Sequence, residues 1–209
     1  MVWLETLKLN LMKKDLASIL HPHSKVEDRF ICDLNELKQI VDSLHLEGKK
    51  IVMTGGSWDL LHIGHVKYLR KAKEMGDILI VAVDGDDVVR KDKGANRPIV
   101  LEDERIQLVG ELRVADIIIK YTTQKEEGPE YIVKFLKPDI LVMSTTTDKK
   151  GDFAKKWAKI YEGICEVVVL EAQALTSTSA RIAQLAKDGG KNLAGKIMEV
   201  INNELGGSE

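Results

Sequence analysis

One stretch, residues 51–65, constrains the fold of this chain more than any other. It combines an apolar run, a glycine turn and a histidine pair (IVMTGGSWDLLHIGH). Ile51–Met53 are typical of a buried strand, Gly55 and Gly56 let the backbone approach a ligand closely, and an amphipathic helix follows from His65. Because free N–H groups and the helix dipole attract anions at a helix N-terminus, this stretch predicts a strand–turn–helix unit with a phosphate site.

Apolar runs and helix-periodic segments alternate along the rest of the chain. The predicted strands are Ile51–Thr54, Asp77–Val83, Ile117–Ile119, Ile140–Met143 and Val167–Leu170. The predicted helices are Leu34–Leu46, His65–Met75, Leu101–Val114, Pro129–Leu136, Phe153–Tyr161 and Ser179–Lys187. This order predicts an α/β fold, a Rossmann-like doubly wound parallel sheet with helices on both faces. Ligands of such folds bind beyond the carboxyl ends of the strands, where Thr54, Asp84 and Ser144 should lie.

We expect three regions: an N-terminal helical extension over residues 1–47, the α/β domain over 48–187 and a C-terminal helical tail over 188–209. The first residues, Met1–His23, predict a charged amphipathic helix that Pro22 closes. The pattern leaves open whether this helix packs on the core, packs on a second subunit or is solvated.

Composition excludes several classes of function. The 209 residues suffice for one α/β domain, and a net charge of −2 with interspersed signs argues against nucleic-acid or membrane binding. Cys32 and Cys165 have no metal-type spacing, which favours a reduced, cytoplasmic protein. No run is apolar and long enough for a signal peptide or a membrane span.

The histidine pair is the strongest candidate for catalysis. A single histidine near a turn is usually an ordinary polar residue, but His62 and His65 flank Gly64 directly after a strand and a glycine turn. Donors fixed at this place suit attack on the α-phosphate of a nucleoside triphosphate, because they stabilise charge on the phosphoryl oxygens in the transition state. The sequence leaves the protonation state of both rings open.

Two further segments carry candidate phosphate ligands. Residues 86–98 predict a basic loop in which Lys91, Lys93 and Arg97 form a lid over phosphates, with a solvated charged loop as the alternative. Residues 175–182 (LTSTSARI) place hydroxyls at the start of a helix, where they either bind phosphates or only cap the helix.

The segment His62-Ile63-Gly64-His65 resembles the HxGH signature of the nucleotidylyltransferase superfamily. Class I aminoacyl-tRNA synthetases share this signature, but they are much longer and carry a lysine-rich KMSKS-type loop that this sequence lacks. The strongest resemblance is to the adenylyltransferase domain of ADP-heptose synthases, whose V-R-x-x-K-G-x-x-R-P segment matches Val89–Pro98. The sequence departs from that family at Gly55, Ser57 and Met143–Asp148.

The resemblance implies roles for individual residues. The catalytic residues it implies are His62, His65 and Lys93. Those implied for nucleotide binding are Thr54, Gly55, Gly56, Ser57, Trp58, Asp59, His62, Gly64, His65, Ser144, Thr145, Ser177, Thr178 and Ser179. Those implied for substrate binding are Asp84, Asp86, Lys93 and Arg97. Mg²⁺ is expected to accompany the nucleotide, with no ligand residue assigned.

The leading hypothesis is therefore a nucleotidylyltransferase that moves a nucleoside monophosphate from an NTP to a phosphorylated small molecule and releases pyrophosphate. ATP is favoured as the donor and a sugar phosphate such as heptose 1-phosphate as the acceptor. One alternative is a CTP-dependent enzyme acting on a phosphorylated polyol or alcohol such as glycerol 3-phosphate. Another is a non-catalytic nucleotide-binding module, because a fold does not fix a function. The expected partners are these small molecules, and a homodimer stays open.

Overall fold

The computed structural model describes residues 16–145, 153–173, 184–193 and 195–196. Five parallel strands form one sheet in the order β3-β2-β1-β4-β5. Their bounds are Ile51–Gly56 (β1), Ile78–Asp84 (β2), Ile117–Tyr121 (β3), Ile140–Ser144 (β4) and Glu166–Leu170 (β5). The strand order reverses between β1 and β4, the usual position of a ligand site in such a sheet.

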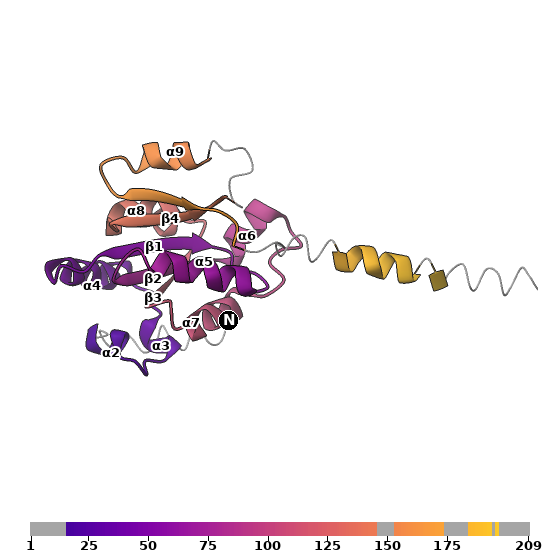
Figure 1. Cartoon of the computed structure of the whole chain (residues 1–209), viewed down its shortest axis with the longest axis horizontal. Helices are drawn as coiled ribbons and strands as arrows, with labels where there is room; N and C mark the ends of the chain where they lie inside the picture. Colours follow the sequence, from indigo (N-terminus) through magenta and orange to yellow (C-terminus); the bar gives the residue numbers. More distant parts are fainter. Residues whose placement is uncertain (1–15, 146–152, 174–183, 194, 197–209) are drawn as a thin grey trace, which may run out of the picture. The chain divides into compact units, whose positions relative to one another are not determined.

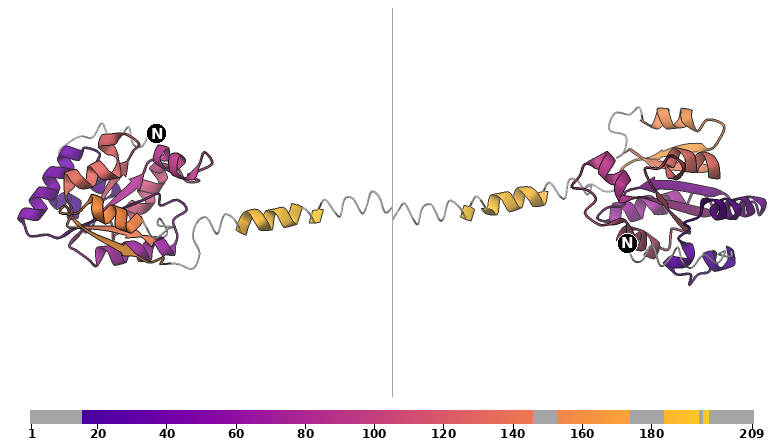
Figure 2. Two further views of the ribbon diagram at one scale, coloured as in Figure 1. Left: turned by 90° about the horizontal axis from the view of Figure 1, so that it is seen from above. Right: turned by 180° about the vertical axis from the view of Figure 1, so that it is seen from behind.

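Helices cover both faces of the sheet, as Figure 1 shows. One core cluster lies between the sheet and the side of α4 (Leu34–Leu46), α8 (Pro129–Leu136) and α9 (Phe153–Ile160), and a second lies on the side of α5 (Ile63–Lys73) and α7 (Glu102–Glu111). Figure 2 shows the same layers from two other directions. The prediction of a doubly wound parallel sheet is confirmed.

An aspartate lies directly before each of the strands β2, β3 and β4, and its carboxylate binds a main-chain N–H at the start of a neighbouring strand. Asp77 accepts a hydrogen bond from the main-chain N–H of Lys50, Asp116 from that of Leu79, and Asp139 from that of Ile51, at 2.7–2.8 Å. These bonds hold the beginnings of β1 and β2 in register with their neighbours. The carboxyl ends of the strands are therefore aligned at the opposite edge.

The described part of the N-terminal region packs on the core. It contains α2 (Leu16–Leu20), α3 (Val26–Arg29) and α4. Ile19 is 1% exposed, the buried Arg29 donates to the main-chain oxygens of Gly110 and Ala115, and Phe30 forms a parallel bridge to Ile118 on β3. The predicted helix over Met1–His23 is described only from residue 16 and ends before Pro22, and residues 1–15 lie outside the described part.

The predicted loop over residues 86–98 is wrong for Asp86–Lys93, which form a helix, α6, whereas residues 94–98 are a loop as predicted. Asp86 and Asp87 stand in its first turn and basic residues in its last, an arrangement that complements the helix dipole. Val89 is buried against the sheet, and Gly94, with φ 97°, ends the helix. A charged segment is thus anchored as a helix by one buried side chain, by favourable end charges and by hydrogen bonds to Asp86 and Asp87 in its first turn.

Most other predictions hold with shifted ends. The helices Leu34–Leu46 and Pro129–Leu136 occur as predicted, whereas α5 begins at Ile63 rather than His65 because His62 caps it. The predicted helix over Ser179–Lys187 is described from residue 184 and continues to 193, through Gly189 and Gly190. The helix expected around Ile197–Ile201 lies outside the described residues.

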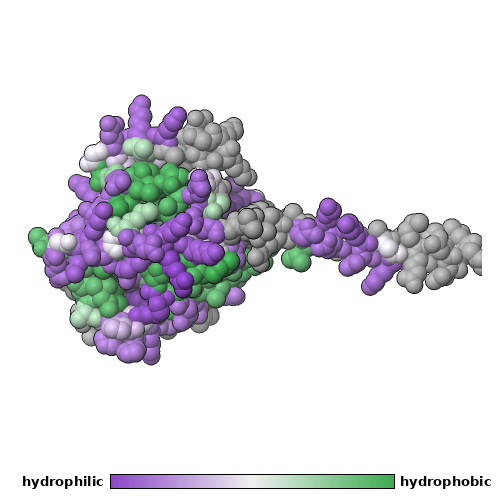
Figure 3. All heavy atoms as spheres, viewed as in Figure 1, coloured by the Kyte–Doolittle hydropathy of each residue, from purple (hydrophilic) through white to green (hydrophobic). Residues whose placement is uncertain are grey.

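Contacts within the chain define two units, Met1–Gln173 and Ala174–Glu209. The first contains the whole sheet, and the described residues of the second are helical. Hydrophilic residues cover much of the face seen in Figure 3, with apolar patches between them. Within the described residues, no helix has the length and apolar character needed to cross a membrane.

Candidate active site

The two histidines cap the helix that carries them. Nδ1 of His62 accepts the main-chain N–H of Gly64 at 3.0 Å, and Nδ1 of His65 accepts the main-chain N–H of His62 at 3.3 Å. The rings stack with centroids 4.0 Å apart. A neutral imidazole that accepts at Nδ1 carries its proton on Nε2, so each ring in its neutral form has its donor at Nε2.

The environment of His65 favours the neutral ring. Burial lowers the pKa of His65 to about 4, and the charges on His62 and Lys93 act in the same direction. The rings of Trp58 and His65 pack in a T-shaped arrangement with centroids 5.5 Å apart, and the indole N–H of Trp58 donates to the Ala82 oxygen. At neutral pH His65 therefore offers an Nε2–H donor held in a fixed orientation.

The two glycines at the end of β1 lie close to aromatic rings, which leaves little room for a side chain at either position. A Cβ on Gly55 would lie 2.6 Å from Cε2 of Tyr121, and a Cβ on Gly56 would lie 3.3 Å from Cε2 of Trp58. The preceding Thr54 is buried, and its hydroxyl bonds to the Val142 oxygen. Thr54 therefore connects β1 to β4 inside the core, whereas Gly55 is exposed at the sheet edge.

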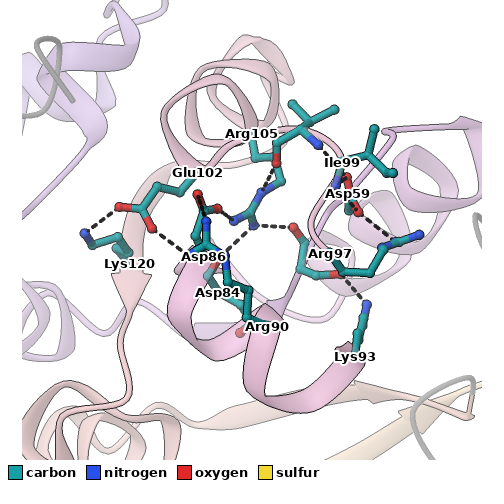
Figure 4. Close-up of polar contacts among 12 residues, drawn as sticks. Asp59, Asp84, Asp86, Arg90, Lys93, Arg97, Ile99, Glu102, Arg105 and Lys120 are labelled. Atoms are coloured by element: carbon teal, nitrogen blue, oxygen red, sulfur yellow. Dashed lines mark hydrogen bonds and ion pairs between the residues drawn. The ribbon is translucent and has the colours of Figure 1, made fainter. Parts of the chain in front are cut away.

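Lys93 reaches the turn that follows β1. It is the last residue of α6 (Figure 4). Its ammonium nitrogen lies 2.6 Å from the hydroxyl of Ser57. Burial of the ammonium group lowers the pKa of Lys93, an effect that the nearby Asp84 opposes. Two residues predicted to contact phosphates, Ser57 and Lys93, are thus brought together from distant segments.

Asp59 and Arg97 bind each other. A carboxylate oxygen of Asp59 lies 2.7 Å from a guanidinium nitrogen of Arg97, and the side chains are 1% and 14% exposed. The same carboxylate accepts the main-chain N–H groups of Ile99 and Val100. Among the described atoms, Nε of Arg97 is buried without a hydrogen-bond partner. The turn after β1 therefore holds the 93–100 segment at two points, Ser57 and Asp59.

Arg105 joins the ends of β1 and β2. Its fully buried guanidinium donates to the main-chain oxygen of Asp84 and, at 2.8 Å, to the carboxylate of Asp86 (Figure 4). It also donates to the main-chain oxygens of Ser57 and Val100. The sequence pattern placed Arg105 only within the predicted helix Leu101–Val114 and did not predict this role. The available signal was its place among the apolar residues of a helix face, four positions before the buried Val109.

Asp84 and Asp86 follow the end of β2. Asp86 starts α6, and its main-chain N–H donates to Glu102. Burial raises the pKa of Asp84 to about 6, although Lys93 and Arg105 lower it. Ser144 ends β4, the strand beside β1, and Thr145 follows it at an exposed position. Ser177, Thr178 and Ser179 lie outside the described residues.

The described residues contain no group of three or more His, Cys, Asp or Glu side chains that could hold a metal ion. Fixed N–H donors and a lysine at the carboxyl edge of the sheet are instead suited to phosphate groups.

Comparisons with known proteins place this geometry in a family. A family model described as cytidylyltransferase-like matches residues 53–191. The chain is 43% identical over 129 residues to the bifunctional protein HldE of a Nitratiruptor species, a match that covers 62% of this chain and 26% of that protein. It is 34% identical over 168 residues to the bifunctional protein HldE of Aliarcobacter butzleri, covering 79% and 33%. The chain thus spans about a third or less of the length of these relatives.

A solved structure shares the fold. The crystal structure of a pantoate-beta-alanine ligase from Francisella tularensis, complexed with beta-gamma ATP and beta-alanine, aligns with a TM-score of 0.50. The alignment covers 72% of this chain and 68% of that chain at 16% identity, so it shows the fold alone. The family model, by contrast, spans the sheet from β1 onward and includes both histidines and Lys93. The chain therefore belongs to the cytidylyltransferase-like family of nucleotidyltransferases.

Proposed function

We propose that this protein transfers AMP from ATP to the phosphate group of a phosphorylated sugar and releases pyrophosphate. The observation that carries the proposal is the pair of capping histidines, whose Nδ1 atoms are occupied by main-chain N–H groups. Their Nε2–H donors are fixed at the N-terminus of α5, in the same site as Lys93 and Ser57. Such an arrangement supports charge that develops on a phosphoryl group.

In the proposed reaction an oxygen of the acceptor phosphate attacks the α-phosphorus of ATP and forms the new O–P bond. The bond from the α-phosphorus to the bridging oxygen breaks, and pyrophosphate leaves with the electron pair. His62 and His65 donate hydrogen bonds to the phosphoryl oxygens, and Lys93 adds a positive charge from α6. This chemistry requires positioning and electrostatic stabilisation without a covalent intermediate on the protein.

We propose Mg²⁺ as a companion of the triphosphate. Because the described side chains form no metal cluster of their own, phosphate oxygens and water would supply most of its ligands. The ion would reduce the charge of the triphosphate when it is bound, and no residue of the described site is assigned to it.

Two observations support ATP and a heptose phosphate. The Val89–Pro98 segment resembles that of ADP-heptose synthases, and the HldE proteins align over 62% and 79% of this chain. A CTP-dependent reaction with glycerol 3-phosphate or another polyol phosphate is the second candidate, supported by the cytidylyltransferase-like family model. A non-catalytic nucleotide-binding module is the third, and the intact histidine geometry argues against it.

Pyrophosphate release separates these candidates. The purified chain would be assayed with ATP, CTP, GTP or UTP and Mg²⁺, each with heptose 1-phosphate, glucose 1-phosphate or glycerol 3-phosphate, and with His65→Ala as the inactive control. Release that needs both ATP and heptose 1-phosphate supports the proposal. Release with CTP and glycerol 3-phosphate would replace it with the second candidate, and nucleotide binding without any release would favour the third.

A further inference from the structure

Asp84 and Tyr121 are neighbours at the carboxyl edge of the sheet. They are register partners on the adjacent parallel strands β2 and β3, and each is the last residue of its strand. Side chains alternate along a strand, and both residues continue the series that faces the core cluster beside α4 and α8. Their side chains therefore lie on the same face of the sheet, where Gly55 of β1 also faces.

The ring of Tyr121 crosses the sheet toward β1. Its Cε2 atom lies 2.6 Å from the position that a Cβ on Gly55 would take, although the strand β2 separates β1 from β3. Tyr121 is 3% exposed, whereas Gly55 is exposed. A phenol and a carboxyl group thus lie at the margin of an accessible patch of backbone, next to the point where the strand order reverses.

The surroundings of Asp84 disfavour the charged form of its carboxyl group. Arg105 donates a hydrogen bond to the main-chain oxygen of Asp84 and not to its carboxylate. Burial raises the pKa of Asp84 to about 6 against the effects of Lys93 and Arg105, and the charges on Asp92 and Asp87 raise it further. Asp84 is half-buried at the end of its strand, and a partly desolvated carboxylate of this kind lowers folding stability.

We propose that Asp84 and Tyr121 form a subsite that binds hydroxyl groups on the carbon skeleton of the acceptor. This inference rests on the proposed function, because it assigns the non-phosphate end of the same acceptor. A carboxylate accepts hydrogen bonds from two hydroxyls, and a phenol can both donate and accept. Burial holds the pKa of Tyr121 well above its usual value, so the phenol keeps its proton.

The charges around the subsite select the class of acceptor. The acceptor phosphate is repelled by Asp84 and attracted by Lys93, so it should lie toward the histidines with the hydroxyls pointing to β2 and β3. Lys93 and Arg105 already supply positive charge next to Asp84, which disfavours an acceptor with an ammonium group. A polyhydroxylated phosphate therefore fits better than an amino alcohol phosphate.

The test measures binding and does not depend on turnover. Heptose 1-phosphate and, separately, ethanolamine phosphate are titrated calorimetrically into protein saturated with a non-hydrolysable ATP analogue, using wild type, Asp84→Asn and Tyr121→Phe. Asp42→Asn on the surface of α4 and Tyr131→Phe on α8 are the matched controls. We expect heptose 1-phosphate to bind roughly tenfold more weakly to Asp84→Asn and about threefold more weakly to Tyr121→Phe, as lost hydrogen bonds predict. Affinity for the ATP analogue should stay within about twofold.

Several results would overturn the subsite. The first is an affinity for heptose 1-phosphate that is unchanged in both variants, and the second is a loss of affinity for the ATP analogue as large as that for heptose 1-phosphate. The others are wild type that binds ethanolamine phosphate more tightly than heptose 1-phosphate, or wild type that does not bind heptose 1-phosphate. Tyr121→Phe keeps the ring that packs on Gly55, so the protein should fold. Pyrophosphate release by wild type is measured in parallel. Its absence would refute the proposed function, while the binding comparison would still decide the subsite.

Discussion

The rings of His62 and His65 stack 4.0 Å apart, and each accepts a main-chain N–H at the start of α5. The same rings therefore cap the helix and present Nε2–H donors to the proposed phosphate site. Because the cap bonds occupy Nδ1, helix formation itself sets which nitrogen of each neutral ring carries the proton. Gly64, between them, is buried, and its N–H makes one of these bonds.

His65→Ala should lower kcat by on the order of 10²-fold or more, because it removes a donor that acts in the transition state. The cap bond to His62 is lost as well, which should reduce the free energy of unfolding by about 1 kcal/mol. Pyrophosphate release and thermal melting measure the two effects. His23→Ala, at an exposed position before α3, is the control. Turnover within a few-fold of wild type would remove His65 from the catalytic site.

Stability should depend on the protonation of His65. Its pKa is lowered from 6.5 to about 4 in the folded protein, so between these values the unfolded chain binds more protons. The contribution of His65 to the free energy of unfolding should therefore decrease as pH falls through this window, by about 1–3 kcal/mol. The ring faces charges on His62, Lys93 and Asp59. Melting curves of wild type and His65→Gln across this range test the sign, and equal pH dependence would contradict it.

Asp84→Asn should stabilise the protein at neutral pH. The pKa of Asp84 is raised from 3.8 to about 6, so the folded state binds more protons between these values and stability falls as pH rises. Removing the carboxylate should add about 1–3 kcal/mol to the free energy of unfolding above this window and nothing below it. Thermal melting at both ends of the window is the measurement, with the exposed Asp42→Asn as control. A variant that melts lower at neutral pH would show that Asp84 stabilises the fold.

Arg105 should tolerate no substitution. Its guanidinium donates to three main-chain oxygens and to the carboxylate of Asp86, and these acceptors lie in three separate segments. Arg105→Lys cannot reproduce this planar set of donors, and we expect a loss of about 3–5 kcal/mol in the free energy of unfolding. Urea unfolding measures it, with the half-exposed Arg90→Lys as the matched control. An Arg105→Lys variant as stable as the control would contradict this assignment.

The parts of the fold that could be predicted are those set by local pattern. The helix Leu34–Leu46 was predicted because its apolar residues follow helical spacing and Asp33 caps it, and β2 because a continuous apolar run suits a strand buried on both faces. Helix α6 was missed because most of its residues are charged and its one buried side chain, Val89, gives no periodic signal.

The site was less predictable because many of its contacts join distant segments. Asp59 and Arg97 each suggest a ligand contact when considered alone, but in the fold they neutralise each other. The role of Arg105 depends on main-chain oxygens whose positions follow from the assembled sheet. The motif placed the histidines correctly at the start of a helix, but the proton position on each ring required the cap geometry.

Substitutions of Lys93 and Arg97, which lie in the same segment, should have different effects: the first mainly on turnover and the second mainly on the free energy of unfolding. Lys93 is exposed as a whole, and only its ammonium group is partly desolvated beside Ser57, so Lys93→Ala should change the free energy of unfolding by less than about 1 kcal/mol. It should lower kcat by on the order of 10²-fold, because a positive charge near the phosphates is lost. Pyrophosphate release and thermal melting are measured on the same samples.

Arg97→Ala is the matched variant for this comparison. It removes the guanidinium that pairs with the buried carboxylate of Asp59, so it should lower the free energy of unfolding by about 3–5 kcal/mol. The two main-chain N–H groups that still bind Asp59 should keep the loss toward the lower end of this range. If Lys93→Ala instead melts far below wild type with normal turnover, Lys93 is a structural residue and the phosphate contact is wrong. If Arg97→Ala melts like wild type but loses turnover, Arg97 acts on the substrate and its pairing with Asp59 contributes little to folding.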